Sequence, residues 1–278
     1  MIPKIVHYCW LSNDPIPEEL QLYMSSWKRF LPDYEFIKWD FNRFNKSSSI
    51  WVSEAFDNKK YAFAADYIRL YALYNYGGIY LDMDVEVLKS YTDEMLSLKN
   101  LICWEREGSG LEVAAFGVEK NSSWIKKCLE YYDNRTFINV DGSFNTKVLP
   151  QVVKDNLIEF QYKLINVNNI SEALLIKSDT EIPILSCDYF SPKSYTTGKI
   201  NITDNTYSIH HFAGSWLVGK KKYEHNLRNK LSFLPWKLGK AISSIITKVK
   251  YEGLAVGIKF IFERIQAVFR LNINNNNV

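Results

Sequence analysis

The sequence lacks the short motifs that mark several large enzyme classes. It contains no Gly-x-x-x-x-Gly-Lys-Ser/Thr loop, no Gly-x-Gly-x-x-Gly fingerprint and no Gly-x-Ser-x-Gly elbow. Those motifs bind phosphates or dinucleotides, or carry the nucleophile of α/β-hydrolases. Their absence argues against a P-loop kinase, a dinucleotide-dependent dehydrogenase and a serine hydrolase of that fold.

Cysteine, net charge and long apolar runs are also scarce. The four cysteines are not paired at metal-ligand or redox spacing, which predicts free thiols in a reducing compartment. A formal charge of +3 is too small to indicate nucleic acid as a partner. No run reaches the roughly 18 apolar residues of a transmembrane helix. The first residues do not resemble a signal peptide. We therefore expect a cytoplasmic protein.

Apolar periodicity predicts strands that alternate with helices, which is typical of an α/β fold with a largely parallel sheet. Strands are expected at 5–10, 35–39, 79–82, 85–87, 101–104, 113–118 and 207–212. Helices are expected at 17–31, 59–75, 122–132 and 146–156. We place a main domain at 1–226, a basic amphipathic helical tail at 227–270 and a disordered terminus at 271–278.

The most informative stretch is residues 76–84, which read YGGIYLDMD. A glycine pair ends the helical pattern, and a short apolar strand then delivers Asp82 and Asp84 to one rim of the sheet. Side chains two apart in an extended segment point the same way, so both carboxylates could share one Mn²⁺ or Mg²⁺ ion. The alternative interpretation is a solvated strand end.

Three further groups of residues could carry chemistry. Asp66 and Arg69 lie three apart on a helix whose neighbouring residues are apolar, so we expect them to point inward rather than form a surface ion pair. His210 and His211 precede Gly-Ser-Trp, and adjacent histidines in a strand face opposite ways, so only one could reach a metal. Trp10 ends the first strand, either as a core residue or as a platform for a nucleotide base.

These residues resemble glycosyltransferase family 32, which includes yeast mannosyltransferases and bacterial capsule and lipopolysaccharide sugar transferases. The likeness lies in residues 2–10 (IPKIVHYCW), 65–69 (ADYIR) and 76–84, and it returns at 210–216 (HFAGSW from His211). The central segment is also similar to the glucosyltransferase domain of large clostridial toxins. The resemblance implies a GT-A fold, which is a Rossmann-like nucleotide-sugar-binding α/β fold, with a C-terminal helical extension here.

The resemblance also implies roles for single residues. Trp10 matches a base-stacking tryptophan, and Tyr80 matches an aromatic residue near the nucleoside. The pair that grips the donor sugar corresponds to Asp66 and Arg69, while Asp82 and Asp84 correspond to the metal-binding acids.

Near the second motif, His211 is preferred over His210 as the metal histidine. Ser215 and Trp216 resemble residues that contact the metal or the β-phosphate.

Together these features predict a retaining, metal-dependent hexosyltransferase that uses Mn²⁺ or Mg²⁺ and a UDP-hexose, with GDP-mannose left open. The expected acceptor is a glycan or a lipid-linked glycan in surface polysaccharide synthesis. One alternative is a metal-dependent hydrolase of nucleotide sugars, which needs no acceptor groove. Another is a non-catalytic, membrane-associated scaffold of the same fold, against which the intact acidic residues argue.

The tail carries a charge that the rest of the chain does not share. Residues 227–270 contain nine Lys/Arg and two Glu, so their charge is 9 − 2 = +7, which leaves 3 − 7 = −4 for the other residues. Apolar residues at near-helical spacing alternate with these cations. The segment could lie on the cytoplasmic face of a membrane, or it could pack on the main domain as ordinary terminal helices.

Overall fold

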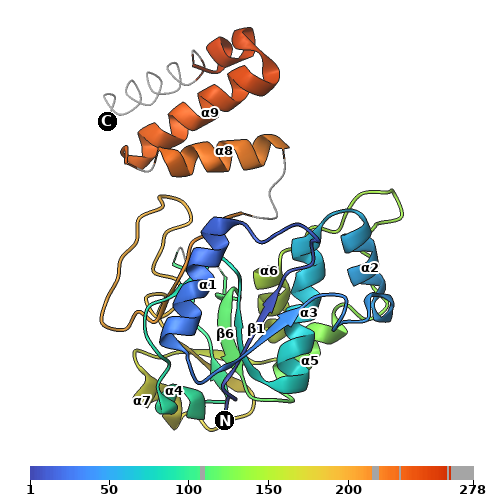
Figure 1. Cartoon of the computed structure of the whole chain (residues 1–278), viewed down its shortest axis with the longest axis vertical. Helices are drawn as coiled ribbons and strands as arrows, with labels where there is room; N and C mark the ends of the chain where they lie inside the picture. Colours follow the sequence, from blue (N-terminus) through green and yellow to red (C-terminus); the bar gives the residue numbers. More distant parts are fainter. Residues whose placement is uncertain (107–109, 215–218, 232, 262, 264–278) are drawn as a thin grey trace, which may run out of the picture. The chain divides into compact units, whose positions relative to one another are not determined.

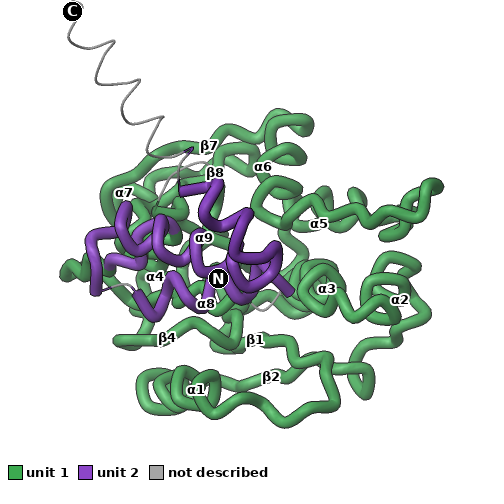
Figure 2. Tube along the Cα trace, turned by 90° about the horizontal axis from the view of Figure 1, so that it is seen from above, with its two compact units in different colours: residues 1–195, 200–216 green, residues 196–199, 217–278 purple. Residues whose placement is uncertain are grey.

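A computed structural model of the chain describes residues 1–106, 110–214, 219–231, 233–261 and 263. The chain divides into unit 1, residues 1–195 and 200–216, and unit 2, residues 196–199 and 217–278 (Figure 2). Unit 2 includes the whole helix α8 (Gly219–Lys230), which begins before residue 227, where the sequence placed the start of the helical tail. No described helix is long and apolar enough to cross a membrane.

Unit 1 contains strands and helices mixed along the chain. The strands are β1 Ile5–Cys9, β2 Glu35–Trp39, β3 Gly78–Leu81, β4 Val85–Val87, β5 Asn100–Leu101, β6 Ala115–Val118, β7 Lys163–Asn166, β8 Glu181–Ile184 and β9 Ser208–His210. The helices are α1 Glu18–Phe30, η1 Lys46–Ser48 (a 3₁₀ turn), α2 Ile50–Asp57, α3 Tyr61–Tyr76, α4 Asp93–Ser97, α5 Ser123–Glu130, α6 Leu149–Glu159 and α7 Ile170–Leu175.

The central sheet has the order β2-β1-β3-β6-β5. Strand β1 pairs in parallel with both β2 and β3, whereas β6 runs antiparallel to β3 and to β5. The parallel strands β1, β2 and β3 therefore open their carboxyl ends on the same rim, where α/β sheets bind ligands. Two short sheets, β4-β9 and β7-β8, lie outside it.

Helices cover both faces of this sheet, with α1 on one side and α3 and α5 on the other (Figure 1). Alternate residues of β3 enter the two cores: Tyr80 faces the α3 side, while Ile79 and Leu81 face the α1 side. This alternation follows from the two-residue period of a strand and explains why all four residues of β3 are buried.

The glycine pair between α3 and β3 is required by close packing. Gly77 has φ +66° and caps α3, and Gly78 has φ +104°. A Cβ on Gly77 would lie 2.6 Å from the backbone nitrogen of Lys120, and one on Gly78 would lie 2.6 Å from the carbonyl oxygen of Ile5. Only glycine combines a positive φ with such contacts. The pair fixes where β3 starts, and thus where its two acids emerge.

Unit 2 contains α8 and α9 (Trp236–Glu252), which pack side by side, and a further helical stretch over 254–261 (Figure 1). The α/β class, the parallel-dominated sheet and the helical C-terminal region predicted from the sequence are therefore confirmed.

Candidate active site

Asp82 and Asp84 lie in a turn at the carboxyl end of β3. The N–H of Val85 donates to the carbonyl oxygen of Asp82 at 3.0 Å, which closes the turn into β4. Asp84 therefore lies in a turn after β3, and not in the extended segment from which the shared direction of the two side chains was predicted. The turn still gathers the two carboxylates. The N–H of Ala213 also donates to Asp84 Oδ2 at 2.6 Å and holds that side chain.

A third potential ligand approaches from β9. Oxygen atoms of Asp82 and Asp84 and a ring nitrogen of His210 all lie within 4.8 Å of one another. Strand β9 pairs antiparallel with β4, and His210 stands opposite Val85, directly after the turn. Its Nε2 is 3.7 Å from Asp84 Oδ2. Two carboxylates and one imidazole form a donor set that suits Mn²⁺ or a similar divalent cation.

His211, the histidine preferred from the sequence, points elsewhere. Its Nε2–H donates to Glu86 Oε2 at 2.9 Å, and its ring stacks on Tyr23 with centroids 4.3 Å apart. Adjacent residues of a strand face opposite sides, so only one of the two histidines could face Asp84. The structure selects His210 for this position, and the preference for His211 is corrected.

Glu112 completes this corner of the site and was not predicted. Its carboxylate is 1% exposed and accepts from His210 Nδ1–H at 3.2 Å, which leaves Nε2 directed toward Asp84. The N–H of Ala114 also donates to it at 2.8 Å. A carboxylate behind a histidine is the usual way to orient a metal-binding imidazole. Glu112 and His210 are 98 positions apart, and no spacing pattern in the sequence links them.

Asp66 and Arg69 point inward, as predicted. Arg69 Nη2 is 3.2 Å from Asp66 Oδ1 and 3.2 Å from Asp82 Oδ1, and Nη1 donates to the carbonyl of Val113 at 2.7 Å. The guanidinium also lies over the ring of Tyr80, whose hydroxyl donates to Asp82 Oδ1 at 3.0 Å. Tyr80 is buried, so its hydroxyl holds the carboxylate of Asp82 from the side of the protein core. Arg69 thus connects Asp66 to the acidic turn.

Burial and neighbouring charges shift the pKa values of this cluster. Burial raises the pKa of Asp66 to about 7, although Arg69 opposes the shift. Burial also raises the pKa of Asp82, against the effect of Arg69. For His210, burial disfavours the charge, but Glu112 and Asp84 outweigh it and raise the pKa to about 9. Such mutually dependent ionisations are typical of functional sites.

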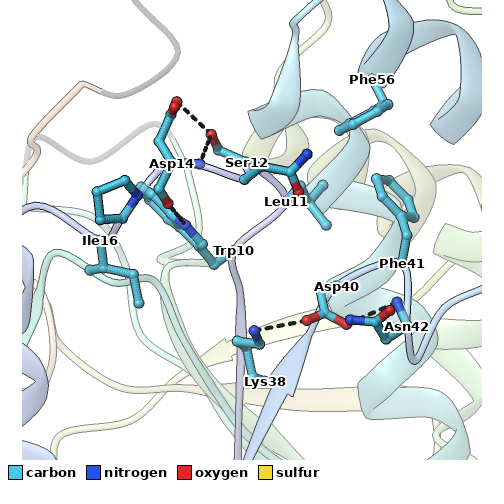
Figure 3. A pocket seen from close by; sticks show the side chains of 12 residues that line it. Trp10, Leu11, Ser12, Asp14, Ile16, Lys38, Asp40, Phe41, Asn42 and Phe56 are labelled. Atoms are coloured by element: carbon cyan, nitrogen blue, oxygen red, sulfur yellow. Dashed lines mark hydrogen bonds and ion pairs between the residues drawn. The ribbon is translucent and has the colours of Figure 1, made fainter.

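A pocket of about 590 Å³ opens at the carboxyl ends of β1 and β2. Figure 3 shows Trp10 on one side of it and Phe41 and Phe56 on the other. The indole N–H of Trp10 donates to the carbonyl of Asp14 at 2.8 Å, which fixes the ring. Trp10 is half-buried, so part of its surface faces the pocket. It is therefore not the fully buried core tryptophan of the alternative interpretation.

Two predicted residues, Ser215 and Trp216, lie outside the described residues. A cation that the sequence did not indicate, Lys193, stands close to the motif that contains them. Its Nζ donates to the carbonyl of His211 at 2.7 Å, and burial lowers its pKa. The backbone N–H of His211 donates in turn to the carbonyl of Asp84, so Lys193 is tied to the acidic turn.

The fold, and the cluster of Asp82, Asp84 and His210 at the carboxyl end of β3, have the arrangement expected of a GT-A nucleotide-sugar-binding domain. Residues 17–102 match the family described as a glycosyltransferase sugar-binding region containing a DXD motif. The matched region contains Asp66, Arg69, Asp82 and Asp84, and the match confirms the recognition made from the sequence.

Two curated relatives are similar over part of the chain. Inositol phosphoceramide mannosyltransferase 3 of Schizosaccharomyces pombe is 39% identical over 88 residues, which cover 30% of this chain and 24% of that protein. Mannosyl phosphorylinositol ceramide synthase SUR1 of Saccharomyces cerevisiae is 31% identical over 147 residues, covering 50% and 37%. The chain thus spans about a quarter to just over a third of these relatives. Among solved structures, the PaToxG glycosyltransferase aligns with a TM-score of 0.46 and 23% identity, covering 57% of this chain and 69% of that one.

Proposed function

We propose that the chain is a retaining, metal-dependent glycosyltransferase that moves a hexose from a nucleotide sugar to a hydroxyl group of a glycan or lipid-linked glycan. One observation carries the proposal. The ligand atoms of Asp82, Asp84 and His210 lie within 4.8 Å of one another at the strand rim, and Arg69 joins them to the buried Asp66.

The residues present fit a divalent cation. Asp82 and Asp84 supply hard oxygen ligands, and His210 supplies a nitrogen whose ring is already oriented by Glu112. A bound Mn²⁺ or Mg²⁺ would neutralise the diphosphate and stabilise it as a leaving group. His211 is not needed for this donor set, because Glu86 holds its Nε2.

The other residues bind and orient the donor in this proposal. Trp10 stacks on the base in the pocket beside it. Asp66 accepts hydrogen bonds from sugar hydroxyls, and Arg69 keeps Asp66 and Asp82 in place. Lys193, tied to the backbone at His211, adds a positive charge near the diphosphate. Fixed positions of this kind align the anomeric carbon with the acceptor.

The names of the relatives guide the choice of substrates. Both are named for transfer of mannose to an inositol phosphoceramide. We therefore place GDP-mannose beside UDP-hexoses as the donors to test first, and an inositol-containing sphingolipid beside surface glycans as an acceptor. The sequence prediction of a UDP-linked donor remains a proposal.

The test is a screen of nucleotide sugars with the full chain and Mn²⁺, with and without acceptors, in which both released nucleotide and glycosylated product are measured. Transfer that needs an acceptor supports a transferase, whereas equal donor cleavage without one supports the hydrolase alternative. Asp84→Asn should lower turnover about 10²-fold or more, because an amide replaces a charged ligand.

Asp93→Asn is the matched control, since Asp93 is an exposed acid on α4. If no donor is consumed under any condition, or if Asp84→Asn matches Asp93→Asn, the proposal is wrong.

A further inference from the structure

Unit 2 buries small and polar residues where a soluble helical pair would bury apolar ones. The buried residues among those described in this unit are His225, Gly239, Ser243, Thr247 and Gly257. No described Leu, Ile, Val, Phe, Tyr or Trp side chain of the unit is buried. Packing of apolar side chains normally supplies most of the stability of paired helices. The large apolar side chains in the described part of unit 2 are therefore half-buried or exposed, and none of them is fully enclosed.

The contact between α8 and α9 shows why the apolar side chains point outward. Gly239, Ser243 and Thr247 recur every four residues and occupy one face of α9. A Cβ at Gly239 would lie 3.1 Å from the carbonyl oxygen of Leu231, so the backbones approach closely there. Ser244 donates a hydrogen bond to Glu224 of α8. Small residues that let helices approach closely are typical of helix pairs in an apolar environment.

Exposed large apolar side chains are frequent along the sequence of unit 2. Of the 21 exposed large apolar side chains described, eight lie within residues 233–258, about a tenth of the chain. They are Phe233, Trp236, Leu238, Ile246, Tyr251, Leu254, Val256 and Ile258. A group of this density marks an interaction surface rather than the scattered exposure of ordinary surfaces.

The charge of the same segment indicates what it binds. Residues 217–278 contain 12 Lys/Arg and 3 Glu, so they carry 12 − 3 = +9, whereas the other residues sum to 3 − 9 = −6. Lys237, Lys240 and Lys250 are exposed on α9 between the apolar residues. Exposed apolar side chains with interleaved cations match the boundary of an anionic bilayer, where acyl chains and charged headgroups lie within a few ångströms.

We propose that unit 2 docks on an anionic lipid surface, with its exposed apolar side chains in the interface and its lysines among the headgroups. The bilayer supplies the apolar surroundings that the helices do not provide for each other. Each lysine close to an anionic surface adds about fivefold to the affinity. The inference is independent of the proposed reaction, since vesicle binding requires neither donor nor acceptor.

Co-sedimentation of the full chain with vesicles tests the inference. One set of vesicles is phosphatidylcholine alone, and the other contains about 30% phosphatidylglycerol, enough to give a negative surface potential. We expect the wild-type chain to bind the anionic vesicles. The double variant Leu238→Ser/Ile246→Ser should lower the partition coefficient about tenfold or more. The control Ile158→Ser/Leu175→Ser removes two similarly exposed apolar side chains from unit 1 and should leave binding unchanged.

Four outcomes would overturn the inference. They are a wild-type chain that stays in the supernatant, equal loss in both double variants, equal binding to the neutral vesicles, and loss of a dimer in the unit 2 variant by analytical ultracentrifugation. The last result would assign the apolar residues to a second copy of the chain. Because both substituted side chains of unit 2 are exposed, circular dichroism should show a folded protein in every case.

Discussion

Replacing His210 by Gln tests the structural choice between two adjacent histidines. His210 Nε2 lies 3.7 Å from Asp84 Oδ2, and its Nδ1–H donates to the buried Glu112. His211 Nε2–H instead donates to Glu86, whose side chain is 36% exposed. The two histidines are neighbours at the end of β9, so His211→Gln is a control of the same size and chemistry.

The structure sets the expected magnitudes. His210→Gln removes a nitrogen ligand but keeps a hydrogen-bond donor for Glu112, so turnover should fall about 10²-fold and the Mn²⁺ requirement should rise. His210→Ala is less informative, because removing the partner of a buried charge costs about 3–5 kcal/mol and could unfold the site. His211→Gln breaks a partly exposed pair worth at most about 1 kcal/mol, which corresponds to about fivefold.

The assay is a Mn²⁺ titration of chelator-treated enzyme, read both as donor turnover and as heat of metal binding. The calorimetric arm gives a result even if the correct acceptor has not been found. If His211→Gln loses more metal affinity than His210→Gln, the assignment drawn from β9 is refuted. Equal and small losses in both variants would show that neither imidazole binds the metal.

Three further predictions follow from the same geometry. Trp10→Ala should weaken nucleotide binding by about 1–3 kcal/mol, the usual contribution of a base–aromatic stack, and Trp10→Phe should recover much of this loss. Calorimetry with UDP and GDP measures the effect. If the Ala variant is unfolded and the Phe variant restores only the fold, the stacking role is contradicted. Asp66→Ala should damage turnover more than affinity for the free nucleotide, which lacks the sugar hydroxyls, and a parallel fall in both would assign Asp66 to the nucleotide instead. Burial lowers the pKa of His7 to about 4, although the hydrogen bond from its Nε2–H to the carbonyl of Gly77 opposes the shift. The neutral Nδ1 accepts from the indole N–H of Trp39. A depressed histidine pKa means that the unfolded chain binds more protons. The stability contributed by the neutral His7 ring is therefore complete above pH 6.5 and is lost as the pH falls toward 4. It amounts to roughly 3 kcal/mol. The free energy of unfolding, measured with urea at several pH values, should therefore change more steeply with pH for the wild type than for His7→Gln. Equal slopes would contradict the assignment.

Local sequence signals were sufficient for the elements that build the rim. The prediction of β2 at 35–39 agrees with the structure, and α1 and α3 are placed to within two residues at each end. The glycine pair before β3 was readable because positive φ and close approach leave no other residue type. Such features depend on neighbours in the chain, which a single sequence records.

Features that depend on distant segments were not readable. The choice between His210 and His211 is set by the pairing of β9 with β4, more than 120 residues earlier. Helices α2, α4 and α7 and strands β7 and β8 were not predicted, since short elements give few repeats of an apolar pattern. The sequence left open whether the apolar residues of unit 2 face outward or pack on the main domain, because periodicity alone does not say which face of a helix is buried.

The charges around the turn after β3 explain why this site is suited to a cation. Asp66, Asp82, Asp84 and Glu112 place four acidic groups together, whereas Arg69 and a protonated His210 supply two positive charges. The group sums to −4 + 2 = −2 when all four acids are ionised, and to −3 + 2 = −1 when Asp66, whose pKa is raised to about 7, holds a proton. Buried charge is costly unless it is paired, and Arg69 is already shared between two of the acids. Binding of a divalent cation would release the proton of His210 and bring the sum to −2 − 1 + 2 = −1 when all four acids are ionised. The acidic groups therefore favour the divalent cation that the proposed reaction requires. The buried Arg69 keeps these groups together until the cation binds.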